Sequence, residues 1–422
     1  MKVLVVGSGG REHAICWKFS QSRNVERIFC APGNAGTGTI ARNIQIAADD
    51  VAGLAQFAEN EGIDLTFVGP EAPMEKGITD EFNRRGLVIF GPSAAAARLE
   101  TSKEFAKEVM AGAGVPTARY EIVHTADDAK RAAEHFGRAA VKADGLAAGK
   151  GVIICTSSSE ILDAVRTLKD QSLFGNAGDR IVVEELLEGD EASILAFCDG
   201  KTATIMVPSQ DHKRIYDGDA GKNTGGMGAY APTPVVQGLE KEIHDKVFVP
   251  VLREMSRRGT PYVGVLYAGL MVNGSEFRVL EFNARFGDPE AQPVLSLLET
   301  DLLDISQACI DGRLGDIDIK WKAGASCCVI AASKGYPDRY EKGKIIEGIE
   351  DAQKLDSVVV FHSGTKTEGG NIVTDGGRVL GVTATGASIK EAIASAYDGI
   401  KLIRFDGMHY RTDIGKAVTG RS

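Results

Sequence analysis

The stretch Val279–Gln292, which reads V-L-E-F-N-A-R-F-G-D-P-E-A-Q, is the most informative part of the 422-residue chain. It begins as an extended strand, in which Glu281 and Asn283 lie two residues apart and project from the same face. A carboxylate beside an amide oxygen is a pair of hard-oxygen ligands that suits Mg²⁺. Arg285 follows on the same face if the strand continues, and it adds a forked cation beside that metal. The segment therefore predicts a site for polyphosphate chemistry.

The alternative interpretation is a solvated strand end, where Glu and Asn are common. The turn that follows argues against it. Gly287 and Pro289 predict a tight turn that crowds Arg285, Asp288 and Glu290 together. Three charged side chains in a turn restricted by glycine and proline are unusual for an ordinary surface loop, so the turn favours a functional site.

Size and composition limit the classes of function. Charged residues make up 25% of the chain and hydrophobic residues 43%, which are ordinary values for a soluble globular protein, and the length predicts two to four domains. The net charge of −10 argues against general nucleic-acid binding and against attraction to acidic membranes. If the ligands are anionic, local basic groups and a metal must hold them.

The cysteine pattern indicates a reducing compartment. Seven cysteines are present, an odd number, and none forms a C-x-x-C pair, so neither a disulfide framework nor a zinc site is expected. The N-terminal apolar run Val3–Val6 is too short for a signal peptide, and no stretch is long enough to span a bilayer. We therefore expect a soluble cytoplasmic protein.

The first hundred residues alternate strand-like and helix-like segments, which predicts a parallel sheet covered by helices. Each strand leads into a glycine-bearing loop, so the loops should gather at the carboxyl edge of the sheet, where open α/β sheets bind ligands. The expected strands are Val3–Val6, Ile28–Cys30, Leu65–Val68 and Val88–Phe90, and the expected helices are His13–Phe19, Val51–Glu59 and Ile78–Arg85.

The first of these loops, G-S-G-G-R-E-H at 7–13, resembles a dinucleotide fingerprint only in part. The pattern G-x-G-x-x-G requires glycine at position 12, where this chain has Glu12, and no convincing acidic residue ends a second strand about twenty residues later. This disfavours an NAD-dependent oxidoreductase. Arg11 and the backbone N–H groups at a helix start would still suit a phosphate.

The middle of the chain holds several further elements. A helix from Ser102 to about Ala111 should be followed by a small unit at about 116–188, with strands Ala139–Ala143, Val152–Cys155 and Ile181–Glu185 and a helix Ser159–Lys169. A larger region should then extend to about Lys322. Within it, Val263–Asn283 predicts a hairpin closed by Asn273-Gly274 in a type I′ turn, which would put Leu266 opposite Glu281. The last hundred residues predict a small α+β domain with glycine turns such as Asp375-Gly376-Gly377.

The segment Ala139–Cys155 predicts a strand, a glycine loop and a second strand. Only three residues separate Gly145 from Gly149, and a strand follows, so this is not a P-loop. Glycines still let successive N–H groups converge on phosphate oxygens, and Lys142 and Lys150 favour that role over a flexible hairpin tip. Farther on, the backbone of Val182–Ser193 leaves a strand with polar groups that could bind an adenine edge, although a solvated strand end stays open as the alternative.

The order of these features resembles the ATP-grasp superfamily, and within it the phosphoribosylamine–glycine ligase family. The resemblance covers nearly the whole chain. The matching motifs are G-G-R-E-H at 9–13, A-P-G-N-A-G-T at 31–37, V-G-P-E-A-P at 68–73, K-A-D-G-L-A-A-G-K-G-V at 142–152, S-Q-D-H-K-R at 209–214, N-T-G-G-M-G-A-Y at 223–230 and R-F-G-D-P-E-A-Q at 285–292.

The resemblance implies an α/β and α+β multidomain fold. An N-terminal parallel α/β (pre-ATP-grasp) domain at 1–102 would bind substrate, and a two-lobed ATP-grasp region would follow at 103–322. A small C-terminal α+β domain would occupy 323–422. The implied reaction joins glycine to 5-phosphoribosylamine through a glycyl phosphate and yields glycinamide ribonucleotide, ADP and phosphate in purine biosynthesis. ATP would be the co-substrate and Mg²⁺ or Mn²⁺ the metal.

The resemblance also implies roles for individual residues. The metal ligands would be Glu281 and Asn283, and the catalytic residues would be Arg285, Lys142 and Asn223, with Arg285 on the glycine carboxylate. ATP would be bound by Lys103, Lys142, Gly149, Lys150, Gly151, Glu184, Glu185, Leu186 and Glu191. The other substrates would be bound by Gly9, Gly10, Arg11, Glu12, Asn34, Pro70, Glu71, Asp211, Lys213, Arg214, Gly225 and Gly226.

Some questions stay open at this point. Many ATP-grasp enzymes have an acidic metal ligand on the neighbouring strand, but Tyr262–Val272 contains none, so the number of metal ions is open. His13 and His212 could serve packing or proton transfer. We expect small-molecule substrates, no nucleic acid or membrane partner, and a monomer. The alternatives are another ATP-grasp carboxylate–amine ligase of nucleotide biosynthesis, an NAD-dependent oxidoreductase and a non-catalytic nucleotide-binding module.

Overall fold

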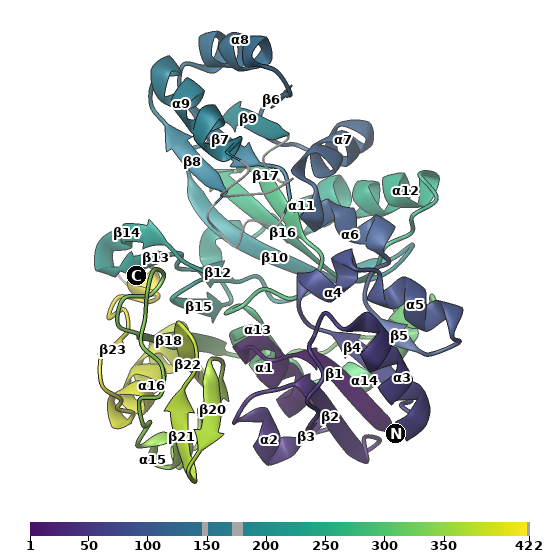
Figure 1. The fold of residues 1–422 in the computed structure, drawn as a ribbon, viewed down its shortest axis with the longest axis vertical. Helices are drawn as coiled ribbons and strands as arrows, with labels where there is room; N and C mark the ends of the chain where they lie inside the picture. Colours follow the sequence, from purple (N-terminus) through teal and green to yellow (C-terminus); the bar gives the residue numbers. More distant parts are fainter. Residues whose placement is uncertain (146–150, 171–179, 420–422) are drawn as a thin grey trace.

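The N-terminal unit is a parallel sheet with helices on both faces, as the alternating pattern predicts. The computed structural model of the protein describes residues 1–145, 151–170 and 180–419. Strands β1 to β5 pair in parallel in the order β3-β2-β1-β4-β5 (Figure 1). The strands are Lys2–Gly7, Arg27–Pro32, Arg42–Asn43, Leu65–Val68 and Ile89–Phe90, and helices α1 to α6 are Gly10–Phe19, Thr37–Ile40, Val51–Glu61, Glu71–Glu75, Ile78–Arg84 and Ala94–Thr101.

A small antiparallel unit follows helix α7. This helix, Lys103–Ala113, begins at the Ser102 cap and ends at Gly114, whose left-handed φ of 67° suits glycine. The sheet has the order β6-β9-β7-β8 and carries helices α8 and α9. Its strands are Tyr120–Val123 (β6), Ala139–Ala143 (β7), Val152–Cys155 (β8) and Ile181–Glu185 (β9), and its helices are Ala126–Phe136 (α8) and Ser158–Leu168 (α9). The predicted strands and the predicted helix are confirmed, whereas β6 and α8 were not expected.

The central sheet, in the order β11-β10-β16-β17, carries the segment from which the sequence analysis began. Its strands are Asp190–Asp199 (β10), Ala203–Ile205 (β11), Val263–Asn273 (β16) and Glu276–Asn283 (β17). The predicted hairpin exists, but its predicted register is wrong. Asn273 pairs with Glu276, so the turn residues are Gly274 and Ser275, and an irregularity beyond Leu270 shifts the pairing further. Gly269, and not Leu266, therefore lies opposite Glu281.

The C-terminal unit is an antiparallel sheet covered by helix α16, Ile389–Leu402. Its order is β12-β15-β18-β22-β19, and the short strand β23 pairs with β18. The first two strands come from the polar stretch of the middle region, so this stretch is held against the C-terminal unit. The strands are Gln210–Asp211 (β12), Gly228–Ala231 (β15), Ala325–Ser333 (β18), Val358–His362 (β19), Arg378–Gly386 (β22) and Met408–His409 (β23).

Two hairpins and several short helices complete the described chain. The hairpins are formed by Arg214–Tyr216 (β13) with Ala220–Asn223 (β14), and by Thr365–Glu368 (β20) with Asn371–Thr374 (β21). The helices are Glu240–Ile243 (α11), Val249–Arg257 (α12), Ala291–Leu297 (α13), Leu302–Ile310 (α14), Ile349–Gln353 (α15) and Lys416–Thr419 (α17), with a π-helical turn at His244–Phe248 and 3₁₀ turns at Asp217–Asp219, Pro234–Val236 and Leu314–Asp316.

The hydrophobic cores join these units. Each face of the N-terminal sheet shares a buried cluster with the central sheet, one through residues such as Leu4 and Leu266 and the other through residues such as Phe67 and Phe286. The small unit and the C-terminal unit have clusters of their own. All seven cysteines are buried free thiols. No helix in the described part of the chain is long and apolar enough to cross a bilayer.

Candidate active site

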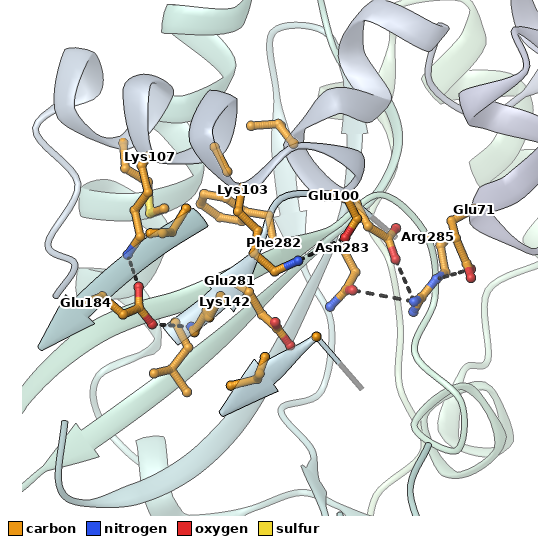
Figure 2. Close-up of a pocket in the computed structure, with 18 residues that line it drawn as sticks. Glu71, Glu100, Lys103, Lys107, Lys142, Glu184, Glu281, Phe282, Asn283 and Arg285 are labelled. Atoms are coloured by element: carbon orange, nitrogen blue, oxygen red, sulfur yellow. Dashed lines mark hydrogen bonds and ion pairs between the residues drawn. The ribbon is translucent and has the colours of Figure 1, made fainter. Parts of the chain in front are cut away.

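A charged cavity of about 330 Å³ lies between the small unit, the central sheet and the N-terminal unit. Figure 2 shows that its charged side chains come from separate elements and converge on one space. Lys103 and Lys107 come from α7, Lys142 from β7 and Glu184 from β9, while Glu281 and Asn283 come from β17. The predicted pairing of Glu281 with Asn283 on one face of a strand is therefore confirmed, and two of the predicted lysines lie in the same cavity.

Glu184 joins two of these lysines. Its carboxylate forms ion pairs with Lys142 and with Lys107, whose Nζ lies 2.7 Å away, and Glu184 is only 1% exposed. Burial alone would raise the pKa of Glu184, but the two ammonium groups outweigh it and hold that pKa below its usual value. From the sequence, the Glu184 backbone was predicted to contact adenine. The structure adds that its side chain fixes the positions of Lys142 and Lys107, and Lys107 was missed.

The surroundings of Glu281 are positively charged. Burial would raise its pKa, but Lys213, Lys142 and Lys103 outweigh this effect and keep the pKa below its usual value, so the carboxylate is ionised. Burial in turn lowers the pKa of Lys103, whose Nζ donates to the backbone oxygen of Gly145 at 3.0 Å. An ionised Glu281 among cations can hold a metal ion or balance bound phosphates.

Arg285 lies beyond the end of β17 and is held by carboxylates from the N-terminal unit. Its Nε donates to Glu71 at 3.1 Å and its Nη2 to Glu100 at 2.6 Å, with a longer contact of 3.4 Å to Asn283 Oδ1 (Figure 2). Burial would lower the pKa of Arg285, but Glu100 and Glu71 raise it. Glu100 was not predicted, because nothing in its local sequence distinguishes it from an ordinary helix residue.

The predicted crowding of Arg285 with Asp288 and Glu290 is only partly correct. Asp288 instead faces Arg378 Nη2, at 3.4 Å, and accepts from Gln292 Nε2 at 2.9 Å. Glu290 accepts from the Ser193 hydroxyl at 3.1 Å. The three charges point to different partners, because the turn holds them on different sides of the backbone.

The residues predicted to contact adenine and ribose have different surroundings. Gly151 lines it, Leu186 is half-buried just after β9, and Glu191 accepts from Lys213 at 2.6 Å. The Glu185 side chain points elsewhere and pairs with Arg119 at 3.2 Å and with Arg278. Gly149 and Lys150 lie outside the residues that the structure describes.

The charged groups of the first N-terminal loop contact each other and the turn that follows β17. Glu12 accepts from the Gly9 N–H at 2.6 Å and from Arg11 Nε at 2.5 Å, and Arg11 Nη1 donates to the backbone oxygen of Phe286 at 3.0 Å. Gly9 precedes α1 and Gly10 begins it, while Pro70 precedes α4, whose first residue, Glu71, lines the charged cavity.

A second cavity, of about 280 Å³, lies between the N-terminal loops and the C-terminal unit. The N-terminal side contributes Ser8, Gly9, Gly33 and Asn34, and the turn after β17 contributes Asp288. The C-terminal unit contributes Ser363, Gly364, Thr365, Asp375 and Arg378. Asn34 bridges the two sides, since its Nδ2 donates to the backbone oxygens of Ser8 and His362, each at 2.8 Å. The sequence analysis missed the C-terminal residues and noted Asp375 only as part of a turn.

The polar stretch between residues 209 and 228 has several separate contacts. Asp211 lies on β12 with its Oδ1 buried and without a hydrogen-bond partner in the described chain, and burial raises its pKa well above the usual value. Arg214 donates to the backbone oxygen of Gly221 at 2.6 Å, and Asn223 is exposed on β14 and lines neither cavity. Gly225 and Gly226 instead contact Arg378, which donates to their backbone oxygens at 2.5 and 3.5 Å.

Of the two histidines that the sequence left open, His13 is buried and His212 is half-buried. Burial lowers the pKa of His13 to about 3, with a smaller effect from His362, and lowers the pKa of His212 to about 4. His13 Nδ1 accepts from the backbone N–H of His362 at 2.8 Å, and His212 Nε2 accepts from Gly415 N–H at 3.3 Å. Both are therefore neutral packing residues in this structure.

Comparison with known proteins agrees with this architecture. The chain matches the N domain of phosphoribosylglycinamide synthetase over residues 1–100, its ATP-grasp (A) domain over 101–291 and its C domain over 326–417. A phosphoribosylamine–glycine ligase from Nostoc sp. is 50% identical over 99% of this chain and 100% of its own length. A second one, from Vibrio vulnificus, is 47% identical over 100% of this chain and 99% of its own length.

Solved structures show the same relationship. The phosphoribosylamine–glycine ligase of Thermotoga maritima superposes with a TM-score of 0.85 at 32% identity and covers 98% of this chain and 100% of that one. The biotin carboxylase domain of the Hydrogenobacter thermophilus 2-oxoglutarate carboxylase, solved with MgADP, has a TM-score of 0.75 at 16% identity and covers 97% of this chain and 91% of that one. The second likeness shows a shared fold only.

The fold and the charged cavity define an ATP-grasp enzyme, which uses ATP. Within that class, the chain belongs to the phosphoribosylamine–glycine ligase family. It is a carbon–nitrogen ligase of purine biosynthesis that acts on ATP, glycine and phosphoribosylamine. The predicted family, fold class and activity are confirmed.

Proposed function

We propose that the charged cavity transfers the γ-phosphoryl group of ATP to the glycine carboxylate and that the amine of phosphoribosylamine then attacks the glycyl phosphate. A free carboxylate is a poor acyl donor, because its charge repels nucleophiles and oxide does not leave. Phosphorylation supplies phosphate as the leaving group. The observation that carries the proposal is the convergence of Lys103, Lys142 and Arg285 on the space beside Glu281 and Asn283, since phosphoryl transfer depends on positioning and charge stabilisation.

Lys103 and Lys142 would bind the phosphates, with Lys142 positioned by its ion pair with Glu184. Gly149, Lys150 and Gly151 would also bind ATP, as the family resemblance implies. The backbone of Glu184, Glu185 and Leu186 would contact adenine, and Glu191 would accept from ribose hydroxyls. Because Glu191 is paired with Lys213 in this structure, nucleotide binding would have to share or replace that contact.

Glu281 and Asn283 fit a divalent cation such as Mg²⁺ or Mn²⁺. They supply an ionised carboxylate and an amide oxygen from one strand face, which are the hard donors that Mg²⁺ prefers. No cluster of three or more His, Cys, Asp or Glu side chains that could hold a metal occurs in the described ranges. Phosphate oxygens or water would therefore complete the coordination. When bound, the metal would neutralise charge on the phosphates.

Arg285 would hold the glycine carboxylate. Its guanidinium lines the cavity, and Glu71 and Glu100 fix its orientation. Asp211, Lys213 and Arg214, with Asn223, Gly225 and Gly226, would lie near glycine and its acyl phosphate. Since Asn223 is exposed here, its catalytic role would require the β13–β14 hairpin to move toward the cavity.

The N-terminal loops would bind phosphoribosylamine through Gly9, Gly10, Arg11, Glu12, Asn34, Pro70 and Glu71. The short contacts of Glu12 to Gly9 and Arg11 support a role in shaping the loop. Among these residues, Glu71 lines the charged cavity and contacts Arg285, so it would lie near the site of phosphoryl transfer.

We also propose that the chain divides at 1–102, 103–322 and 323–422, with a nucleotide-clamping lobe at about 116–188, and that it acts as a monomer in the cytoplasm. The separate hydrophobic cluster of the small unit supports a lobe that can move as one body. A reducing compartment suits its seven buried thiols.

The test is an assay of ADP release with ATP, Mg²⁺, glycine and freshly generated phosphoribosylamine, in which each component is omitted in turn. We expect ADP release to require all four and glycinamide ribonucleotide to accumulate in equal amount. If another carboxylate and another amine support faster ADP release, the enzyme is a different ligase of the ATP-grasp class.

A further inference from the structure

We propose that Lys107 and Thr117 are positioning residues of the nucleotide site, which fix Lys142 relative to strand β17 through a chain of polar contacts. This inference rests on the proposed function, because it takes Lys142 as a ligand of the ATP phosphates. Neither Lys107 nor Thr117 was predicted from the sequence. Thr117 lies outside the described lining of the charged cavity, so its role can be tested without changing a group that faces the ligand.

Thr117 lies where the chain leaves helix α7 and enters the small unit. The segment at this point runs beside β17, since the Val279 N–H donates to the backbone oxygen of Pro116 at 2.8 Å and Thr117 forms a parallel bridge with Val279. Strand β17 is the outer strand of the central sheet, so the segment pairs with its edge. Val279 precedes Glu281 by two residues. The entry to the small unit is therefore held against the strand that carries the proposed metal ligands.

The Thr117 hydroxyl extends this contact to helix α7. It donates to the Val279 backbone oxygen at 2.7 Å, and its oxygen accepts from Lys107 Nζ at 2.8 Å. An ammonium group can only donate and a hydroxyl has a single hydrogen, so the direction of both bonds is fixed. A valine at position 117 would remove both bonds and nearly keep the shape of the side chain.

Lys107 connects this hydroxyl to strand β9. Its Nζ lies 2.7 Å from the Glu184 carboxylate, and the two side chains are only 3% and 2% exposed. Burial lowers the pKa of Lys107, and the Glu184 carboxylate opposes that effect. Glu184 in turn pairs with Lys142 from β7 (Figure 2). The members of the polar chain are, in order, Val279, Thr117, Lys107, Glu184 and Lys142.

The apolar cores leave the position of the small unit to such polar contacts. The small unit has a buried cluster of its own, which includes Val141 from β7 and Val183 from β9. Val109 from α7 and Val279 from β17 belong to a different cluster. Apolar packing alone tolerates small displacements between two bodies, whereas hydrogen bonds depend on distance and direction. The polar chain therefore sets the separation of Lys142 from β17 more strictly than packing does.

This separation matters for phosphoryl transfer. Lys142 comes from the small unit and Glu281 from the central sheet, and both line the charged cavity. A phosphate held by the first and a metal held by the second must meet at a fixed distance, and a displacement of about 1 Å can cost about 100-fold in rate. Loss of the Thr117 hydroxyl should therefore affect both nucleotide binding and turnover.

The decisive experiment compares Thr117→Val with the wild-type enzyme. We expect the Kd of ADP with Mg²⁺, measured by calorimetry, to rise about fivefold or more and kcat to fall about fivefold or more, while the KM for glycine stays within about twofold. Thr117→Ser keeps the hydroxyl and should restore the Kd and kcat to within about twofold of the wild-type values. A hydroxyl that serves stability alone would lower the melting temperature without changing the Kd of ADP.

Thr79→Val is the matched control. Thr79 is a buried threonine of the N-terminal unit whose hydroxyl donates to the Gly91 backbone oxygen at 3.1 Å. This variant should lose stability and keep the wild-type Kd of ADP and kcat.

A double variant tests whether Lys107 and Thr117 act as one chain. Lys107→Met should weaken ADP binding and lower kcat at least as much as Thr117→Val, because Lys107 connects the hydroxyl to Glu184. Adding Thr117→Val to Lys107→Met should then change the Kd of ADP by less than about twofold, since a connection already broken cannot be broken again. Effects of the two substitutions that multiply in full would contradict a single chain.

The outcomes separate the two proposals. If the wild type releases no ADP with the four components, the proposed function fails. If the wild type turns over but Thr117→Val keeps its Kd of ADP and its kcat within about twofold, only the positioning role of Lys107 and Thr117 is refuted. The same holds if Thr117→Val and Thr79→Val change the Kd of ADP equally.

Discussion

Glu184 shows how one buried carboxylate can organise a binding site. It is paired with Lys107 and Lys142 at once, so neither ammonium group is free to turn away from the cavity. An ammonium held in advance costs less to order when phosphate binds. Lys142 is therefore the residue at which loss of charge should affect turnover most directly.

For Lys142→Met we expect turnover to fall at least 100-fold, which corresponds to about 2.7 kcal/mol of lost charge stabilisation. Steady-state ADP release measures the effect. Lys130→Met is the control, because Lys130 is exposed on α8 and pairs with its neighbour Asp127, at 3.1 Å. A well-folded Lys142→Met enzyme with near-normal turnover would remove this lysine from the phosphate site.

Glu281→Gln tests the metal assignment at the same scale. The amide keeps the shape and removes the charge, so the Mg²⁺ concentration for half-maximal activity should rise at least tenfold. Glu276→Gln is a matched control, since Glu276 is exposed at the other end of β17. An unchanged Mg²⁺ titration for Glu281→Gln would place the metal elsewhere.

At the scale of elements, two neutral histidines join helix α1 to strand β19. Burial lowers the pKa of His13 from 6.5 to about 3 and that of His362 from 6.5 to about 4. The unfolded chain would protonate both near pH 6.5. Acidification from pH 7 to 5 therefore stabilises the unfolded state, and each histidine should lower the free energy of unfolding by about 2 kcal/mol at pH 5.

His13→Asn tests this contact. The asparagine oxygen can accept from the His362 N–H in place of Nδ1, but it does not titrate. We expect the melting temperature of the variant to fall less than that of the wild type between pH 7 and pH 5. Equal losses in the two proteins would mean that His13 does not cause the acid sensitivity.

At the scale of the whole molecule, Arg378 holds three distant parts of the chain together. From β22 it reaches the Gly225 backbone oxygen, 153 residues away, and the Asp288 backbone oxygen, 90 residues away. The C-terminal unit thereby fixes both the loop that contains Gly225 and the turn that follows Arg285. It also shares a sheet with β12 and β15 of the middle region.

For Arg378→Met we expect at least a tenfold lower kcat and about 2 kcal/mol less stability, because the backbone oxygens lose a charged donor. Nucleotide affinity should stay within twofold, since the residues proposed to bind the ATP phosphates line the other cavity. Turnover and a nucleotide titration measure these effects, with exposed Arg404→Met as the control. Loss of nucleotide affinity in Arg378→Met would contradict the separation of the two cavities.

Interactions between residues close in sequence were largely predictable. The alternation of the first hundred residues and the common face of Glu281 and Asn283 both follow from periodicity or from local backbone geometry. The hairpin register was not predictable to the residue. Asn273-Gly274 indicates a turn, but the turn begins one residue later, and an irregularity near Leu270 has no local signal.

The layered α/β order of the N-terminal unit, the common face of Glu281 and Asn283 on β17 and the family could all be inferred from the sequence alone, because these depend on spacings of a few residues. The pairing of Arg285 with Glu71 and Glu100, across 214 and 185 residues, became visible only in the folded chain. The same holds for Ser363 and Arg378, which face the N-terminal loops. The physical reason is that such contacts result from the packing of whole sheets, to which all buried side chains contribute and which no short pattern encodes.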